Sequence, residues 1–141
     1  MTERTGGCLC GAVRFTASDV ETNHHACHCG MCRKWSGGPM LAAMTGAIRF
    51  ETSDALARYE SSTWAERGFC RRCGSSLFYF LKPTGQYSVA VGAFDDPTDF
   101  RLAEEIYVDH QPPGYAFAGA RPRLTEAEVL ARFAPDSDGK T

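Results

Sequence analysis

The sequence has no long hydrophobic run and no excess of positive charge. No stretch approaches the ~20 apolar residues that a helix needs to span a bilayer. The N-terminal segment MTERTGGCLCG has no apolar core of the kind found in signal peptides, so we expect a cytoplasmic protein. With 15 basic and 17 acidic residues the net charge is −2, which provides no positive field to attract nucleic acid or an anionic membrane. We therefore expect neither as a partner.

Linkers, internal repeats and low-complexity segments are also lacking before the C-terminal tail. The chain of 141 residues is long enough for one domain with its own core, and its hydrophobic fraction of 43% is that of a globular protein. We expect a single domain over residues 1–134 and a flexible tail over 135–141.

Helix signals are scarce, and strand signals are frequent. Short segments that alternate apolar and polar residues, or that are rich in apolar and aromatic residues, predict strands over residues 11–17, 47–51, 55–60, 66–70, 76–81, 87–92 and 105–109. Only residues 124–133 predict a helix: Thr125 and Glu128 form a capping box, and Val129, Leu130 and Phe133 fall on one face. The fold class is therefore mainly β with a short C-terminal helix.

Cysteine, in contrast, is abundant. An odd number of seven cysteines, in a chain expected to meet a reducing cytoplasm, indicates metal ligands rather than disulfides. They form three clusters: a CxC pair (Cys8, Cys10), a CxCxxC triple (Cys27, Cys29, Cys32) and a CxxC pair (Cys70, Cys73).

Two groupings of these clusters are compatible with the spacing. The CxC and CxxC pairs together make one closed site of four thiolates, the usual structural zinc site, and leave the triple as a second site. Alternatively, Cys29 and Cys32 join the CxxC pair in the closed site. Spacing alone does not decide between these groupings. A further interpretation is that the cysteines are small buried residues with no ligand role.

A site of three thiolates favours a particular chemistry. Catalytic zinc has three protein ligands and an exchangeable fourth position. Three thiolates make zinc a weaker Lewis acid, and a sulfur-rich site prefers another soft ligand, so a thiol substrate is the natural occupant. The bound thiol would lose its proton at neutral pH and could attack a small aldehyde. This favours thiol–carbonyl addition over hydrolysis.

The motifs GGCLCGAVRF, CHCGMCRKWSG, GFCRRCGSSLFY and VAVGAFDDPTDF resemble, in this order, those of the glutathione-dependent formaldehyde-activating enzyme family. The resemblance runs from about residue 6 to residue 117. The family shares its domain with centromere protein V and has an Mss4-like fold of folded β-sheets (a β-tent). Its reference activity is the addition of glutathione to formaldehyde, which gives S-hydroxymethylglutathione and is classed as a carbon–sulfur lyase reaction.

The resemblance also implies two Zn²⁺ ions per chain and assigns their ligands. The structural zinc ligands are Cys8, Cys10, Cys70 and Cys73, and the catalytic zinc ligands are Cys27, Cys29 and Cys32. The chain departs from the family pattern at two places. Glu105 stands where a HIW-like stretch has its histidine, with Tyr107 for the aromatic residue, and QPPGYAF replaces an APW-like segment. If these positions shape the pocket, the substrate differs from the reference one.

Residues beside the triple are further candidates. Arg33 and Lys34 either bind the carboxylates of a glutathione-like substrate or balance the charge of the thiolates. Trp35 either walls a pocket or packs in the core. His28, between two ligands, is expected to point away from the metal, whereas His24 or His25 could supply a fourth ligand.

Candidates outside the triple are weaker. Asp95 and Asp96 precede a proline, where turn capping is the simpler role and proton transfer the other. His110 has no identifiable partner in the sequence.

The sequence therefore predicts a zinc enzyme that acts on adducts of a thiol with a small aldehyde. One alternative is a non-catalytic interaction module in which both zinc ions are structural. A second is a redox protein that uses Cys29 and Cys32 as a dithiol.

Overall fold

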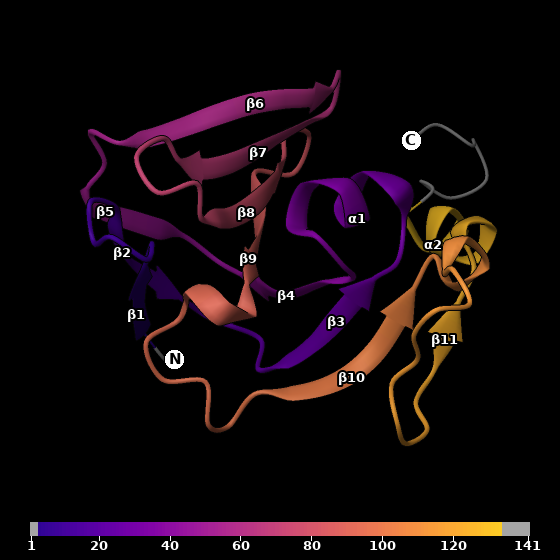
Figure 1. Ribbon diagram of the computed structural model, residues 1–141. Coiled ribbons are helices and arrows are strands. Elements are labelled where there is room, and N and C mark those ends of the chain that lie inside the picture. The colour runs from indigo at the N-terminus through magenta and orange to yellow at the C-terminus, as the bar shows by residue number, and fades with distance from the viewer. Residues whose placement is uncertain (1–2, 134–141) are drawn as a thin grey trace. The chain divides into compact units, whose positions relative to one another are not determined.

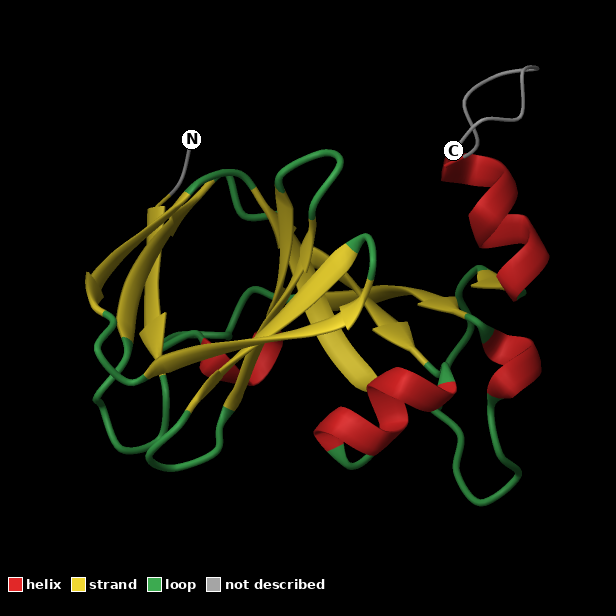
Figure 2. Cartoon of the chain, turned by 90° about the horizontal axis from the view of Figure 1, so that it is seen from above, coloured by secondary structure: helices red, strands yellow, loops and turns green. Residues whose placement is uncertain are grey.

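A computed structural model describes residues 3–133, and the fold is mainly β with a short C-terminal helix, as predicted. Figure 2 shows strands as the predominant element. The chain divides into two compact units, and each is described by itself. Unit 1 contains residues up to 24 and residues 41–101, and unit 2 contains residues 25–40 and those from 102 onward. The tail predicted over 135–141 lies outside the described residues.

Unit 1 contains two sets of antiparallel strands. The first is a three-stranded sheet in the order β1-β2-β5, formed by β1 (Glu3–Gly7), β2 (Arg14–Ser18) and β5 (Ile48–Thr52). The second has the order β4-β9-β8-β7-β6 and comprises β4 (Met40–Thr45), β6 (Leu56–Ser62), β7 (Ala65–Cys70), β8 (Ser76–Leu81) and β9 (Gln86–Ala90). Strands β6 to β9 follow one another side by side (Figure 1), and a 3₁₀ turn, η1 (Val91–Ala93), follows β9.

The core of unit 1 is built from the inward-facing residues of these strands. Phe15 of β2 is almost fully buried and packs edge-on against Phe94, with ring centroids 5.8 Å apart. Phe78 of β8 is equally buried and lies opposite Val89 of β9 in the register. Phe15 lies in a segment predicted as a strand from its alternation, and Phe78 lies in one predicted from its apolar and aromatic residues.

Unit 2 is smaller and carries most of the helical structure. Its strands lie in the order β11-β10-β3, with β3 (Asn23–Cys27), β10 (Arg101–Ile106) and β11 (Arg123–Leu124); β10 and β11 are parallel, and β10 lies beside β3 (Figure 1). The helices are α1 (Gly30–Ser36) and α2 (Glu126–Phe133), and η2 (Val108–His110) is a 3₁₀ turn. No helix among the described residues has the length and apolar character needed to cross a membrane.

The C-terminal helix is confirmed in its position and its cap. Helix α2 begins at Glu126, the Glu128 amide donates to Thr125 Oγ1 at 3.3 Å, and the Thr125 amide donates to Glu128 Oε1 at 2.8 Å. Val129 is buried, but Leu130 is 52% exposed, so the apolar face is narrower than predicted.

The expectation of a single helix is wrong, because α1 is a second one. This helix has seven residues, too few for a helical period to stand out in the sequence. Its start is capped by the sulfur of Cys29 and its end by Gly37 in the left-handed conformation, at φ 87°. Most predicted strands are confirmed, but the last one is displaced: β10 begins at Arg101 and ends at Ile106, whereas the prediction was 105–109.

Candidate metal centres

Four cysteine sulfurs of unit 1 converge between two turns. Cys8 and Cys10 lie in the turn between β1 and β2, Cys70 ends β7, and Cys73 lies in the turn between β7 and β8. All four sulfurs lie within 4.8 Å of one another, with Cys8 to Cys10 at 3.7 Å and Cys10 to Cys70 at 3.8 Å. A tetrahedral zinc with Zn–S bonds of about 2.3 Å has sulfur–sulfur edges of about 3.8 Å. The four-cysteine group therefore fits a zinc ion.

Backbone N–H groups point at these sulfurs. The Val13 amide donates to Cys8 Sγ at 3.2 Å, and the Cys73 amide donates to Cys70 Sγ at 3.5 Å. Such donors stabilise thiolates. Hydrogen bonds from Ser75 also lower the pKa of Cys73, to about 5. The turn around Cys70 closes through Gly74, whose φ of 81° favours glycine and whose amide donates to the Cys70 carbonyl.

Three cysteine sulfurs of unit 2 form a second group. Cys27 ends β3, Cys29 is the N-cap of α1, and Cys32 lies in the first turn of that helix. Their sulfurs also lie within 4.8 Å of one another, and the Cys32 amide donates to Cys29 Sγ at 3.3 Å. Within the described residues, this group contains three cysteines and no fourth histidine, cysteine or acidic residue. The structure thus brings the clusters together as four plus three.

The three thiols of this group influence one another's ionisation. Donation from the thiol of Cys27, and from that of Cys32, holds the pKa of Cys29 far below its ordinary value. The same interaction with Cys29 raises the pKa of Cys27 far above it. Ionisation of one thiol is favoured, but a second or third thiolate would repel the first. A divalent cation would offset this repulsion and allow all three sulfurs to ionise.

His28 turns away from the sulfurs, as expected. Its side chain is fully buried, with Nε2 2.9 Å from Glu105 Oε1 and Nδ1 2.8 Å from the hydroxyl of Tyr115. Glu105 is 2% exposed, and its other partners are Arg121 at 2.6 Å and Arg123 at 3.2 Å. Burial alone would raise the pKa of Glu105, but hydrogen bonds from Arg121 and the other partners bring it below its ordinary value.

Sequence reasoning identified Glu105 as a departure from the family pattern but did not connect it to His28. The two residues are 77 positions apart. They meet because β10 lies beside β3 and the His28 amide donates to the carbonyl of Ile106. No local pattern in the sequence could have indicated this contact.

The basic and aromatic candidates beside the triple lie on α1. Arg33 is half-buried, and its Nε donates to the His28 carbonyl at 2.9 Å. This bond holds the guanidinium against the segment that carries Cys27 and Cys29. Lys34 is exposed, and Trp35 is half-buried.

The histidines considered as fourth ligands are not grouped with the three sulfurs in the described part of the chain. His24 is buried in unit 1, with its ring 6.3 Å from that of Phe100. His110 does have a partner: its Nε2 lies 2.8 Å from Glu126 Oε1, at the exposed start of α2.

The two aspartates before Pro97 have structural contacts. Asp95 accepts two hydrogen bonds from Arg14, at 3.0 and 2.6 Å, and one from Thr5 at 2.7 Å. Asp96 accepts from the Thr98 amide at 3.1 Å. The contact of Asp96 agrees with turn capping, whereas Asp95 instead pairs with side chains of β1 and β2.

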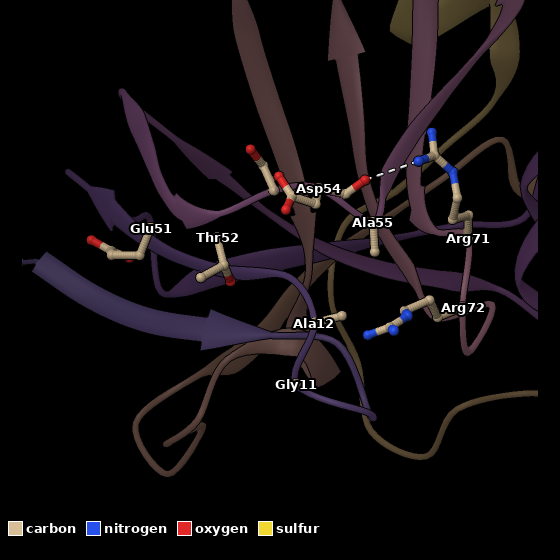
Figure 3. A pocket seen from close by; sticks show the side chains of 9 residues that line it. Gly11, Ala12, Glu51, Thr52, Asp54, Ala55, Arg71 and Arg72 are labelled. Atoms are coloured by element: carbon tan, nitrogen blue, oxygen red, sulfur yellow. Dashed lines mark hydrogen bonds between the residues drawn. The ribbon is translucent and has the colours of Figure 1, made fainter.

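A hollow in unit 1 lies beside the four-cysteine group rather than at the three-cysteine group. Its volume is about 670 Å³, and it is lined by polar residues that include Glu51, Asp54, Arg71 and Arg72 (Figure 3). Arg71 donates to the backbone carbonyl of Asp54 at 2.9 Å. No thiol lines this hollow, so the thiol chemistry predicted from the sequence does not belong to it.

Comparisons with known proteins agree with the arrangement of the cysteines. The model of the glutathione-dependent formaldehyde-activating enzyme family matches residues 3–110. The chain is 30% identical to an uncharacterized lyase of Schizosaccharomyces pombe, over 92% of this chain and 96% of the relative. It is 32% identical to a Halomonas elongata protein provisionally named a glutathione-dependent formaldehyde-activating enzyme, over 53% of this chain and 54% of that one.

A solved structure is similar to this chain in fold. A crystal structure of a Rhodobacter sphaeroides protein aligns with a TM-score of 0.57 and 26% identity, over 67% of this chain and 93% of that chain. The mainly β architecture and the cysteine clusters are consistent with the Mss4-like fold. The family match covers most of the chain and includes all seven cysteines. The chain therefore belongs to the glutathione-dependent formaldehyde-activating enzyme family.

Proposed function

We propose that the protein is a cytoplasmic zinc enzyme that joins a thiol, glutathione or a similar one, to a small aldehyde such as formaldehyde. In the reverse direction it would act as a carbon–sulfur lyase of the S-(hydroxymethyl)glutathione synthase type. One observation carries the proposal: three sulfurs, and no fourth protein ligand among the described residues, converge at the junction of β3 and α1. Family membership and the lyase name of the Schizosaccharomyces pombe relative support it.

The residues present fit the two metals of the proposal. The four-cysteine group would hold a closed, structural zinc that stabilises unit 1. The three-cysteine group, Cys27, Cys29 and Cys32, would hold the catalytic one. When bound there, zinc would supply an exchangeable position for a soft donor and would lower the pKa of a thiol in that position.

The reaction forms one bond to sulfur. The substrate thiolate attacks the aldehyde carbon, a C–S bond forms, and the electron pair of the C=O π bond moves to oxygen. That oxygen then takes up a proton, and the product is a hydroxymethyl thioether. The thiol releases one proton before the attack and the oxygen takes up one after it, so the overall addition consumes and releases no net proton.

Arg33 and Lys34 are the proposed contacts of the substrate's carboxylates. They lie on the same short helix as Cys32, and Arg33 is held by its bond to the His28 carbonyl. A guanidinium fixed in this way suits a carboxylate, since little side-chain entropy remains to be lost on binding. The alternative role of these two residues is to balance the charge of the thiolates. Measurement of substrate affinity distinguishes the roles, because only the first role involves contact with the substrate.

The experiment measures zinc content and turnover together. The wild-type protein is assayed for the rate of thiohemiacetal formation across a panel of thiols and aldehydes that includes glutathione and formaldehyde. We expect two zinc ions per chain and a rate above that of the uncatalysed reaction for at least one pair. Arg33→Ala should raise KM more than it lowers kcat, and Arg71→Ala, in the hollow of unit 1, is the matched control.

Two results would contradict the proposal. Two zinc ions with no acceleration for any pair would favour the non-catalytic module. One zinc ion with a reversible disulfide between Cys29 and Cys32 would favour the redox protein.

A further inference from the structure

His28 is fixed at every polar atom that it has. Its ring nitrogens contact Glu105 and Tyr115, its amide donates to the Ile106 carbonyl at 3.0 Å, and its own carbonyl accepts from Arg33 Nε at 2.9 Å. The side chain is 0% exposed. The residue between Cys27 and Cys29 is thus held by groups that are not themselves metal ligands.

Glu105 is a rigid anchor for this histidine. Its Oε2 accepts from Arg121 at 2.6 Å, its Oε1 accepts from Arg123 at 3.2 Å, and its amide donates to the Pro122 carbonyl at 3.0 Å. The parallel pairing of β10 with β11 places Glu105 directly opposite Arg123. A buried carboxylate with two guanidinium partners has little freedom to move away from His28.

Tyr115 holds the opposite side of the ring. Its ring is stacked on that of His28, with centroids 5.5 Å apart and an angle of 23° between the planes. Since a carboxylate only accepts, Nε2 of His28 carries the proton toward Glu105, and in the neutral ring Nδ1 accepts from the hydroxyl of Tyr115. Glu105 and Tyr115 thereby fix both the orientation and the tautomer of the imidazole.

Removal of either partner would release the ring. A buried ring nitrogen without a partner is unfavourable, so the ring would turn or admit water rather than stay in place. The backbone of His28 joins Cys27 directly to Cys29, and movement of the ring would displace one or both sulfurs. Partners that orient the ligands of a metal are typically worth about 10–100-fold in its affinity.

We propose that Glu105 and Tyr115 are positioning residues for the three-cysteine centre, which act through His28 to hold the sulfurs of Cys27 and Cys29 where a metal can use them. Both lie at the places where the chain departs from the family's motifs. The inference rests on the proposed role of the three cysteines as a metal centre. It adds residues far from the CxCxxC motif to the determinants of that centre.

The test measures the affinity of each centre for Co²⁺ through the absorption of the cobalt–thiolate bands. The variants are Glu105→Ala, Glu105→Gln and Tyr115→Phe, and the four-cysteine group serves as the internal reference. We expect Glu105→Ala to weaken the three-cysteine centre by about 10–100-fold and to leave the four-cysteine centre unchanged. Glu105→Gln should recover part of this loss, because an amide oxygen still accepts from Nε2 while the bond to Arg121 is lost.

Two matched controls accompany these variants. Glu104→Gln changes the neighbouring carboxylate on β10, whose partner is Arg132 at 2.7 Å. Tyr59→Phe removes a hydroxyl from a tyrosine of unit 1 that is 62% exposed. Neither control should alter the affinity of the three-cysteine centre, whereas Tyr115→Phe should lower it even if Glu105→Ala does not fold.

The outcomes separate this inference from the proposed function. Two Co²⁺ ions per chain with equal affinities in wild type, Glu105→Gln and Tyr115→Phe would overturn the inference alone. A parallel loss of affinity at both centres would also overturn it, because the residues would then support only the fold. A single Co²⁺ ion in the wild-type chain would overturn the proposed second centre, and the inference with it.

Discussion

At the scale of single residues, polar contacts between residues that are far apart in the sequence join the segments of unit 1. Asp95 illustrates this, because its carboxylate accepts from Arg14 of β2 and from Thr5 of β1. Hydrogen bonds from Arg14, and then from Thr5, lower the pKa of Asp95 to about 2. The carboxylate is 44% exposed, so solvent screening reduces what the pair contributes to stability.

The lowered pKa of Asp95 predicts a dependence on pH. A carboxylate with a folded-state pKa below its unfolded-state value stabilises the fold above the unfolded-state value, near 4. This contribution is lost as the pH falls toward 2. Asp95→Asn should therefore lower the free energy of unfolding by less than about 1 kcal/mol at pH 7 to 5. The difference from wild type should shrink below pH 4 in urea titrations; a difference that grows there would contradict this account.

Gly68 gives a prediction about the core. A Cβ atom at this position would lie 2.2 Å from Cζ of Phe78, a ring that is 1% exposed and has no room to move. We expect Gly68→Ala to lower the free energy of unfolding by about 1–3 kcal/mol, the usual cost of an overpacked core. Gly92→Ala is the control, because nothing lies within 4 Å of its Cβ position. Equal melting temperatures for the two variants would contradict the packing described.

At the scale of elements, prediction from sequence succeeded where a local pattern existed. The alternation in β2 and the aromatic residues of β8 identified these strands, and the capping box identified the start of α2. Strand β3, NHHAC, has polar histidines on both faces, and β4, MLAAMT, has no alternation, so neither was predicted. These strands form because of their neighbours in the sheets, which is information that a short segment does not contain.

The stability of helix α1 depends on the residues that cap its ends more than on those of its short interior. Gly37 has φ 87°, and its amide donates to the Arg33 carbonyl at 2.9 Å. Alanine in this left-handed conformation costs about 1–2 kcal/mol. We expect Gly37→Ala to lower stability by about that amount and to weaken the three-cysteine centre, since α1 carries Cys32. Gly38→Ala, with no atom within 4 Å and no positive φ, should have neither effect.

At the scale of the whole molecule, the cysteines were predictable and their supporting residues were not. Each pair or triple is a local motif, but their spacing left two groupings open, and the family resemblance implied the one that the sulfur positions show. The contact of His28 with Glu105 depends on strand order, and the roles of Tyr115 and Arg121 depend on the path of a loop. Contacts of this kind have no signature in a single sequence.

We expect cysteine-to-serine substitutions in the two groups to differ in effect: one should lower stability, and the other should remove metal and activity. Cys8→Ser removes a proposed zinc ligand from the four-cysteine group, which joins the β1–β2 turn to the end of β7 and the β7–β8 turn, so we expect unit 1 to lose several kcal/mol of stability. Cys29→Ser should lose the second zinc ion and the activity while thermal unfolding stays cooperative. Circular dichroism and zinc analysis of both variants check this, and global unfolding of Cys29→Ser would show that the second centre is structural.

The central claim is that the three-cysteine centre holds a metal that accepts a thiol as its fourth ligand. The most direct measurement is a titration of the Co²⁺-loaded protein with glutathione, followed through the cobalt–thiolate absorption of each centre. We predict that the bands of the three-cysteine centre change with saturable binding, that those of the four-cysteine centre stay constant, and that Cys29→Ser abolishes the change. Bands at both centres that do not respond to glutathione or to any other thiol would contradict the claim.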